Sequence, residues 1–235
     1  MKSLTRRIEN YWDERSENFS RTRRLELEGV DAVAWKNLFQ KNLPAGRLKI
    51  LDVGTGAGFF AAILSELGHE VIGVDLSVKM LCEADKNLRG MKLNAEFKRM
   101  NAQELNFDDE TFDAVVTRNL TWTLPNVKAA YSEWFRVLKV GGVLMNFDSD
   151  YGDTDFFDDK TCTKGEVPDA LLIECDAIRN VMEISTRRRP SWDVGFLEGL
   201  NFSSVRIDED ISAAVKNDLR GVYDSVPLFA IYAVK

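Results

Sequence analysis

Three glycines follow an aspartate in the stretch KILDVGTGAGFF, residues 49–60. Gly54, Gly56 and Gly58 stand at alternate positions where one apolar segment ends and another begins. Glycine permits a sharp turn, and its lack of a side chain lets a ligand touch the main chain. In open α/β sheets, a strand, a glycine-rich turn and a helix bind ligands beyond the carboxyl ends of the strands. The stretch therefore predicts either a tight turn alone or a turn against which a ligand lies.

Two carboxylates near this turn indicate the kind of ligand. Asp75 ends the next apolar segment, about 20 positions further on, where an acidic residue can accept hydrogen bonds from ribose hydroxyls. Asp52 adds a negative charge beside the turn, which disfavours a pyrophosphate and suits a cationic nucleoside. S-adenosylmethionine has a ribose, an adenine, a sulfonium and an amino group but no phosphate, so it meets these requirements. Alternatively, Asp75 only caps the helix that follows it.

Two other nucleotide motifs do not match the glycine turn. The dinucleotide fingerprint needs a small residue where the bulky Phe59 stands, which disfavours an NAD-dependent oxidoreductase. No Gly-Lys-Ser/Thr sequence follows the turn, so the phosphate-binding loop of nucleoside triphosphatases is excluded.

Strand and helix patterns alternate from residue 47 to residue 150. Asp52, Asp75 and the glycine turn lie where predicted strands end. The patterns predict strands at 48–53, 70–75, 94–100, 112–118 and 143–150, and helices at 58–68, 77–90 and 127–142. Such alternation is typical of a parallel sheet with helices on both faces. Segments 202–208 and 227–235 predict two further strands. The predicted fold class is therefore α/β, with a Rossmann-like, doubly wound, mostly parallel seven-stranded sheet.

The remaining segments predict additions to this sheet within one domain. Residues 1–46 read as an N-terminal helical cap and residues 47–150 as the cofactor-binding core. Residues 151–190 form a late, substrate-side insertion that contains a helix, and residues 191–235 close the sheet.

The core sequence resembles a known enzyme family. LDVGTGAGFFAAILSELGHEVIGVDLSVKMLCEA is similar to the first conserved motifs of the class I S-adenosylmethionine-dependent methyltransferases. NAQELNFDDETFDAVVTRNLTWTLPNVKAAYSEWFRVLKVGGVLMN resembles the continuation in their small-molecule branch. The resemblance covers roughly residues 47–147. The most similar group contains the quinone-biosynthesis C-methyltransferases (methyltransferase type 11), in which an Arg-Asn pair, here Arg118-Asn119, also follows the fourth strand.

The resemblance implies a binding role for residues at each strand end. Gly54 and Gly56 would line the methionine end of S-adenosylmethionine, and Asp52 would hold its amino group. The other implied cofactor contacts are Asp75 at the ribose, Leu76 and Met80 near the adenine, Asn101 and Ala102 at the adenine edge, and Arg118 beside the sulfonium. Asn101 stands where many relatives have Asp, but its amide oxygen could accept from the adenine amine. Arg118 could equally be a structural ion-pair partner.

The resemblance also implies direct, in-line transfer of a methyl group to a small-molecule acceptor, with S-adenosylhomocysteine as the product. Asn119 would lie beside the sulfonium, as a candidate catalytic and substrate-binding residue. Tyr11, Trp12 and Trp122 are further candidate substrate contacts, although Trp122 also suits core packing with Trp134 and Phe135. If a general base is used, the candidates are Asp148, Asp150 and Tyr151 at the end of the fifth core strand. A module that binds the cofactor without catalysis is the alternative function.

Composition narrows the function further. The net charge of −7 and the lack of an Asn/Asp/Ser-Pro-Pro-aromatic motif after the fourth strand make nucleic acid a poor substrate prediction. One histidine, His69, disfavours a histidine triad or a multi-histidine metal site, so no metal is expected. The odd set of Cys82, Cys162 and Cys175 favours a reducing, cytoplasmic location. No apolar run is long enough for a membrane span, and a homodimer is possible.

One basic run near the end of the insertion leaves two interpretations open. Residues 187–193 read RRRPSWD. This run either is solvated or binds an anionic substrate.

Overall fold

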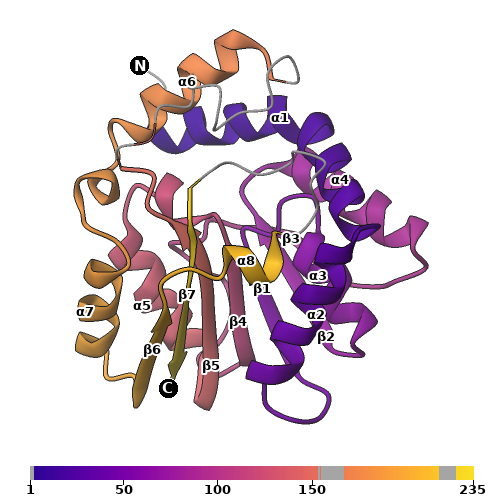
Figure 1. Ribbon diagram of the computed structural model, residues 1–235, viewed down its shortest axis with the longest axis vertical. Helices are drawn as coiled ribbons and strands as arrows, with labels where there is room; N and C mark the ends of the chain where they lie inside the picture. The colour runs from indigo at the N-terminus through magenta and orange to yellow at the C-terminus, as the bar shows by residue number, and fades with distance from the viewer. Residues whose placement is uncertain (1–2, 153, 155–166, 217–225) are drawn as a thin grey trace.

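The computed structural model describes residues 3–152, 154, 167–216 and 226–235 (Figure 1). Its seven strands form one sheet in the order β3-β2-β1-β4-β5-β7-β6. They are β1 (Lys49–Val53), β2 (Glu70–Asp75), β3 (Glu96–Arg99), β4 (Phe112–Arg118), β5 (Leu138–Ser149), β6 (Ser204–Asp208) and β7 (Leu228–Val234). The first five strands pair in parallel, and β7 runs antiparallel to both β5 and β6. The predicted mostly parallel seven-stranded sheet is confirmed.

Helices connect and cover the strands. The α-helices of the described residues are α1 (Leu4–Leu27), α2 (Val30–Asn42), α3 (Phe59–Glu66), α4 (Val78–Gly90), α5 (Val127–Val137), α6 (Asp169–Arg179), α7 (Ser191–Gly199) and α8 (Ser212–Val215). Short 3₁₀ turns are η1 (Thr121–Thr123) and η2 (Glu183–Thr186). The sequence predicted the helices of the first half of the chain, whereas α7 falls where it predicted none.

Successive residues of one strand pack into different apolar clusters, because side chains alternate between the two faces of a sheet. In β1, Ile50 joins a cluster with Trp35 of α2 and Phe60 of α3. Its neighbour Leu51 joins the cluster that contains Trp134 of α5. Both strand residues are fully buried, so helices cover the central sheet on both faces.

The boundary between α5 and β5 differs from the prediction. The helix was expected to continue to Gly142, but it ends at Val137 and the strand begins at Leu138. Leu138 pairs with Phe112 of β4, and the register shifts just afterwards, where Gly141 has a φ of +79°. Sheet pairing therefore extends β5 through a segment whose glycines suggested the end of a helix.

The order of the strands creates a crevice at one end of the sheet. The chain moves outward from β1 to β2 and β3, and then returns to the other side of β1 to form β4. Ligands bind at such a switch point, outside the carboxyl ends of the strands. Figure 1 shows α1 and α6 lying side by side across one end of the molecule. The two helices are joined by Arg7, whose guanidinium donates two hydrogen bonds of 2.9 Å to the carboxylate of Glu174.

None of the helices in the described parts of the chain combines the length and apolar character needed to cross a membrane.

Candidate functional site

A cavity of about 260 Å³ lies at the carboxyl ends of β1, β2 and β4, with α1 on its other side. All of the predicted cofactor residues line it: Asp52, Gly54, Gly56, Asp75, Leu76, Met80, Asn101, Ala102 and Arg118. The predicted substrate contacts Tyr11, Trp12, Asn119 and Trp122 line it too, as does Tyr151. The sheet thus brings together residues that are far apart in the sequence.

The three glycines of the turn have different environments. All have a positive φ, of +67° at Gly54, +53° at Gly56 and +83° at Gly58, which side chains rarely tolerate. A Cβ at Gly58 would lie 3.0 Å from the Cβ of Ala84, so this glycine allows α4 to pack closely. Gly54 and Gly56 border the cavity instead. The turn is therefore tight and also exposes main chain to a ligand.

The carboxylate of Asp52 lies at the base of this turn and is almost fully buried. One of its oxygens, Oδ2, accepts hydrogen bonds from the Thr55 hydroxyl at 2.6 Å and from the Ala61 N–H at 3.1 Å. Burial raises the pKa of Asp52 from 3.8 to about 7, and the nearby charge of Asp75 adds to this effect. A cation brought into the cavity would favour the ionised form of this side chain.

Asp75 lies at the end of β2 and connects two neighbouring main-chain segments. Its Oδ2 accepts a 2.9 Å hydrogen bond from the N–H of Gly56, and its Oδ1 accepts one of 2.9 Å from the N–H of Ser77. Burial raises the pKa of Asp75 to about 6. The hydroxyl of Ser77 caps α4 by accepting from the N–H of Met80, so the cap is Ser77 and Asp75 is left to face the cavity.

Asn101 has a more local role than predicted. Its Oδ1 accepts hydrogen bonds from the main-chain N–H of Gln103 at 3.1 Å and from the Gln103 side chain at 3.0 Å. These two bonds use both lone pairs of the oxygen. The amide oxygen of Asn101 can therefore accept from an adenine amine only if Gln103 moves.

Arg118, at the end of β4, forms the structural ion pair that was the alternative to a cofactor role. Its Nη1 lies 2.8 Å from the carboxylate of Glu26 on α1, and both side chains are largely buried. The guanidinium also lies over the ring of Phe59, 4.8 Å from its centroid. The pair fastens the end of α1 to the sheet at the border of the cavity.

Asn119 has two unusual features. Its φ is +50°, a conformation that Asn adopts more readily than most residues. Its main-chain oxygen accepts from the indole N–H of Trp122 at 2.9 Å. Its side-chain oxygen is buried and has no hydrogen-bond partner in the described part of the chain. Since buried polar atoms are nearly always paired, this oxygen has an unused bonding position at the cavity.

Two of the predicted base candidates, Asp148 and Asp150, do not line the cavity, although β5 ends close to where it was predicted to end. Asp148 is fully buried, accepts from the main-chain N–H of Thr121 at 2.8 Å and lies 3.5 Å from Arg189. Asp150 accepts from the N–H of Arg189 at 3.1 Å. Of the three candidates, Tyr151 alone lines the cavity.

The basic run at 187–193 is divided: Arg187 and Arg188 are exposed, as the solvated interpretation expects, whereas Arg189 is not. Arg189, in its centre, is buried and donates two hydrogen bonds to Asp193, at 2.9 and 2.8 Å. Asp193 also accepts from the hydroxyl of Tyr131 at 2.6 Å. This network connects the insertion to α5 inside the protein, so Arg189 is neither solvated nor open to a substrate.

The helix α1 contributes residues that the sequence interpretation missed. Phe19 packs over the glycine turn, with a ring carbon 3.3 Å from the place a Cβ of Gly56 would take. Arg15 and Thr22 also line the cavity. The available signal was the helical spacing of Ile8, Trp12, Arg15 and Phe19, which places their side chains on one face.

The chemistry of this site fits an adenosyl cofactor. The main chain of the glycine turn borders the cavity, together with the carboxylates of Asp52 and Asp75. Asp75 lies where a carboxylate can accept hydrogen bonds from ribose hydroxyls. No three His, Cys, Asp or Glu side chains among the described residues gather so that they could hold a metal ion.

Comparisons with known proteins agree with this geometry. Residues 51–146 match the family model of a methyltransferase domain. A phosphatidylethanolamine N-methyltransferase of Cereibacter sphaeroides is 36% identical over 99 residues, which are 41% of this chain and 48% of the relative. A demethylmenaquinone methyltransferase of Clavibacter sepedonicus is 33% identical over 138 residues, 57% of this chain and 54% of the relative. The chain therefore spans about half the length of these curated relatives.

A solved structure shows the same fold at lower identity. The phosphoethanolamine N-methyltransferase 2 of Haemonchus contortus, in complex with S-adenosyl-L-methionine, aligns with a TM-score of 0.59 and 17% identity, over 84% of this chain and 51% of that protein. The matched residues, 51–146, include the glycine turn, Asp75 and the end of β4. Residues 51–146 are therefore similar to a methyltransferase domain, in agreement with the resemblance seen in the sequence.

Proposed function

We propose that this protein is an S-adenosylmethionine-dependent methyltransferase that acts on a small-molecule acceptor. The observation that carries the proposal is the cavity at the switch point of the sheet, where Gly54, Gly56 and Asp75 meet within the family domain. The structural neighbour from Haemonchus contortus supports the choice of cofactor, because its structure holds S-adenosyl-L-methionine.

Each side of the cavity has a distinct role in this proposal. The bound cofactor supplies an activated methyl group on its sulfonium. Asp75 accepts hydrogen bonds from the ribose hydroxyls, and Asp52 provides negative charge for the amino group. The main chain at Gly54 and Gly56 leaves room for the methionine end. The helix α1 covers the site and excludes water, which suits a reaction that depends mainly on alignment.

The acceptor is held on the side of β4 and α1. The unpartnered oxygen of Asn119 accepts a hydrogen bond from an N–H or O–H of the acceptor. Trp12 and Trp122, whose ring centroids are 6.5 Å apart, form aromatic walls with Tyr151, 5.3 Å from Trp122. Since the methyl donor is already activated, a strong general base is not required, and Tyr151 remains the candidate if one is used.

The curated relatives support a small molecule as acceptor without identifying it. One is named for phosphatidylethanolamine and another for demethylmenaquinone, which differ in chemistry and in the methylated atom. Nothing in the comparisons favours the alternative of a module without activity. A single methyltransferase domain over residues 1–235, a cytoplasmic location and a homodimer remain predictions from the sequence.

Calorimetric titration tests the proposal directly. S-adenosylmethionine and S-adenosylhomocysteine should bind with micromolar affinity, and NAD should not bind. Asp75→Ala removes a charged acceptor of two hydroxyl hydrogen bonds, so binding should weaken by about 100-fold or more. Asp85→Ala is the matched control, because that carboxylate lies on the exposed side of α4 and pairs with Arg89 at the surface. Binding of NAD in place of the adenosyl compounds, or equal affinity in both variants, would refute the proposal.

A further inference from the structure

The cationic side chains of the cavity are almost all engaged within the protein. The described lining contains four of them, Arg15, Arg23, Arg118 and Lys216. Arg23 and Arg118 both pair with Glu26, at 2.6 and 2.8 Å. Lys216 donates to the main-chain oxygen of Val226 at 2.9 Å. Three of the four positive charges therefore have partners already.

Arg15 is the exception. Its Nε and Nη1 are buried and have no hydrogen-bond partner in the described chain. Burying a guanidinium without an anion or an acceptor is costly, so such a group in a cavity is expected to meet an anion when a ligand binds. The planar fork of arginine matches a carboxylate, which it binds through two parallel hydrogen bonds.

The position of Arg15 on α1 places it near the methionine end of the proposed cofactor. It stands one helical turn before Phe19, whose ring packs over Gly56 of the glycine turn. Side chains on a helix lean toward its N-terminus, and residues spaced by four lie on one face. Arg15 and Phe19 thus approach the same side of the cavity, on which the main chain of Gly54 and Gly56 is exposed.

The charges of S-adenosylmethionine fit this arrangement. The molecule carries a sulfonium, an ammonium and a carboxylate. Asp52 and Asp75 supply negative charge and hydroxyl acceptors to the site, but neither can hold the carboxylate, which needs a cation. Arg23 and Arg118 already share the carboxylate of Glu26, and Lys216 bonds to the main chain, whereas the buried nitrogens of Arg15 have no ion-pair or hydrogen-bond partner among the described residues.

We propose that the guanidinium of Arg15 binds the carboxylate of the cofactor's methionine moiety. This inference rests on the proposed function and adds a residue of α1, outside the matched family domain, to the cofactor site. It also gives the cofactor a direct bond to the helix that covers it.

The test compares two ligands that differ by one group. S-adenosylmethionine carries the carboxylate, whereas decarboxylated S-adenosylmethionine keeps the sulfonium and the amino group and lacks it. The native protein should prefer the first ligand by about 10- to 100-fold, as for a hydrogen-bonded charge pair. Arg15→Met should lose most of this preference by weakening only the binding of the first ligand, and Arg15→Lys should recover part of it.

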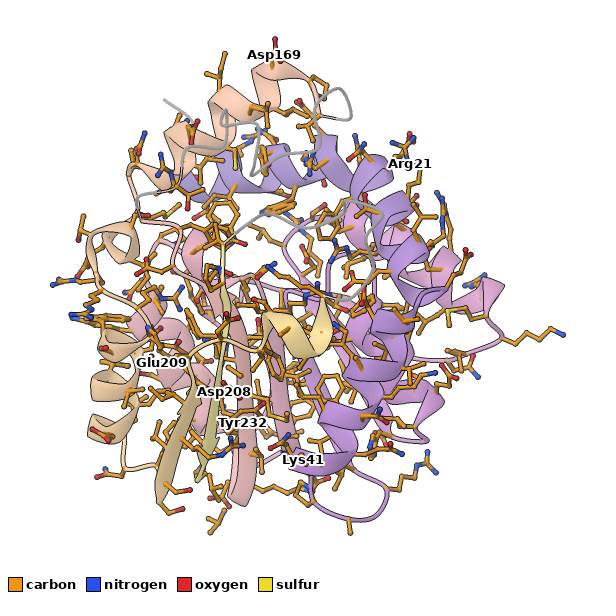
Figure 2. The ribbon with its side chains drawn as sticks, in the orientation of Figure 1. Arg21, Lys41, Asp169, Asp208, Glu209 and Tyr232 are labelled. Atoms are coloured by element: carbon orange, nitrogen blue, oxygen red, sulfur yellow. The ribbon has the colours of Figure 1, made fainter. Side chains whose placement is uncertain are left out.

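Arg21→Met is the matched control, because it removes a guanidinium from the same helix outside the cavity lining. Figure 2 shows Arg21 at the edge of the molecule, pointing away from its body. This variant should keep the preference of the native protein. Thermal unfolding of each variant shows whether the fold is intact.

The outcomes are distinct. An equal loss of affinity for both ligands in Arg15→Met, or no loss for either, would overturn the assignment of the carboxylate to Arg15. If the native protein binds neither ligand, the proposed function fails, and the assignment fails with it. Native binding of both ligands with the same affinity would leave the function standing and overturn the assignment alone.

Discussion

Replacement of Asp52 by Asn should stabilise the protein and weaken its cofactor binding. Both hydrogen bonds to this side chain reach one oxygen, Oδ2, from Thr55 and Ala61. An Asn side chain can place its amide oxygen there and keep both bonds. The substitution therefore removes a buried negative charge at almost constant shape and bonding.

The size of the stabilisation follows from the pKa of Asp52. Burial raises this pKa to about 7 in the folded protein, against 3.8 in the unfolded chain. Between these values the folded state binds the proton more readily, so the free energy of unfolding falls as the pH rises through this window. Above pH 7 the cost is on the order of 4 kcal/mol, at 1.36 kcal/mol per pKa unit, and Asp52→Asn should recover much of it.

Urea unfolding at pH 4 to pH 8 measures this effect. The native protein and Asp52→Asn should be almost equally stable near pH 4, and the variant should be increasingly more stable up to about pH 7. The comparison isolates Asp52, because Asp75 and Asp148, whose pKa values are also raised by burial, are present in both proteins. Asp85→Asn, a surface change, is the control. A stability difference that does not change with pH would refute the reasoning.

Cofactor binding should change in the opposite direction. A bound sulfonium and ammonium favour the ionised carboxylate, so native binding of S-adenosylmethionine should release protons near pH 6 to 7. Calorimetry in buffers of different ionisation enthalpy counts these protons. The Asn variant should bind more weakly and release fewer. Stability and affinity that rise together would contradict the assignment of Asp52 to the cofactor site.

Two other substitutions test the packing around the site. Gly58→Ala should lower the free energy of unfolding by about 1–3 kcal/mol, because φ is +83° and the new Cβ would lie 3.0 Å from that of Ala84. Gly46→Ala, with a φ of +101° and no atom within 4 Å, is the control for backbone strain alone, and an equal loss in urea unfolding would contradict the packing argument. Arg189→Met should cost about 3–5 kcal/mol by leaving Asp193 buried without its cation. Asp193→Asn in the same background should restore part of that stability, and no restoration would show that Arg189 acts only through its volume.

The sequence was most informative where structure is local. Alternating apolar residues predicted β1, β2 and β4, and the glycines predicted the turn after β1, because each signal lies within a few residues. The cap of α4 by Ser77 is a local feature of the same kind, because this residue lies directly before the first residue of the helix. Parallel pairing then brings the ends of these strands to one edge of the sheet, so the cofactor side of the cavity follows from strand order.

Features that depend on pairing between distant segments could not be predicted in this way. β5 begins at Leu138 because Leu138 pairs with Phe112, and no local pattern shows where the partner strand lies. Asp148, near the end of the same strand, lies 3.5 Å from Arg189, and no local pattern shows this contact either. The burial of Arg189 likewise depends on Asp193 and Tyr131, which the sequence places far from a recognisable site.

The N-terminal helix is part of the site, because one of its faces completes the cavity. Asp13 accepts a 2.6 Å hydrogen bond from the hydroxyl of Ser77 at the start of α4, and Glu26 pairs with Arg118 at the end of β4. These bonds hold α1 across the carboxyl ends of β2 and β4, with Arg15 between them. A ligand that contacts both the glycine turn and Arg15 joins the helix to the sheet. Ligand binding and the docking of α1 are therefore coupled, and each should strengthen the other by the same free energy.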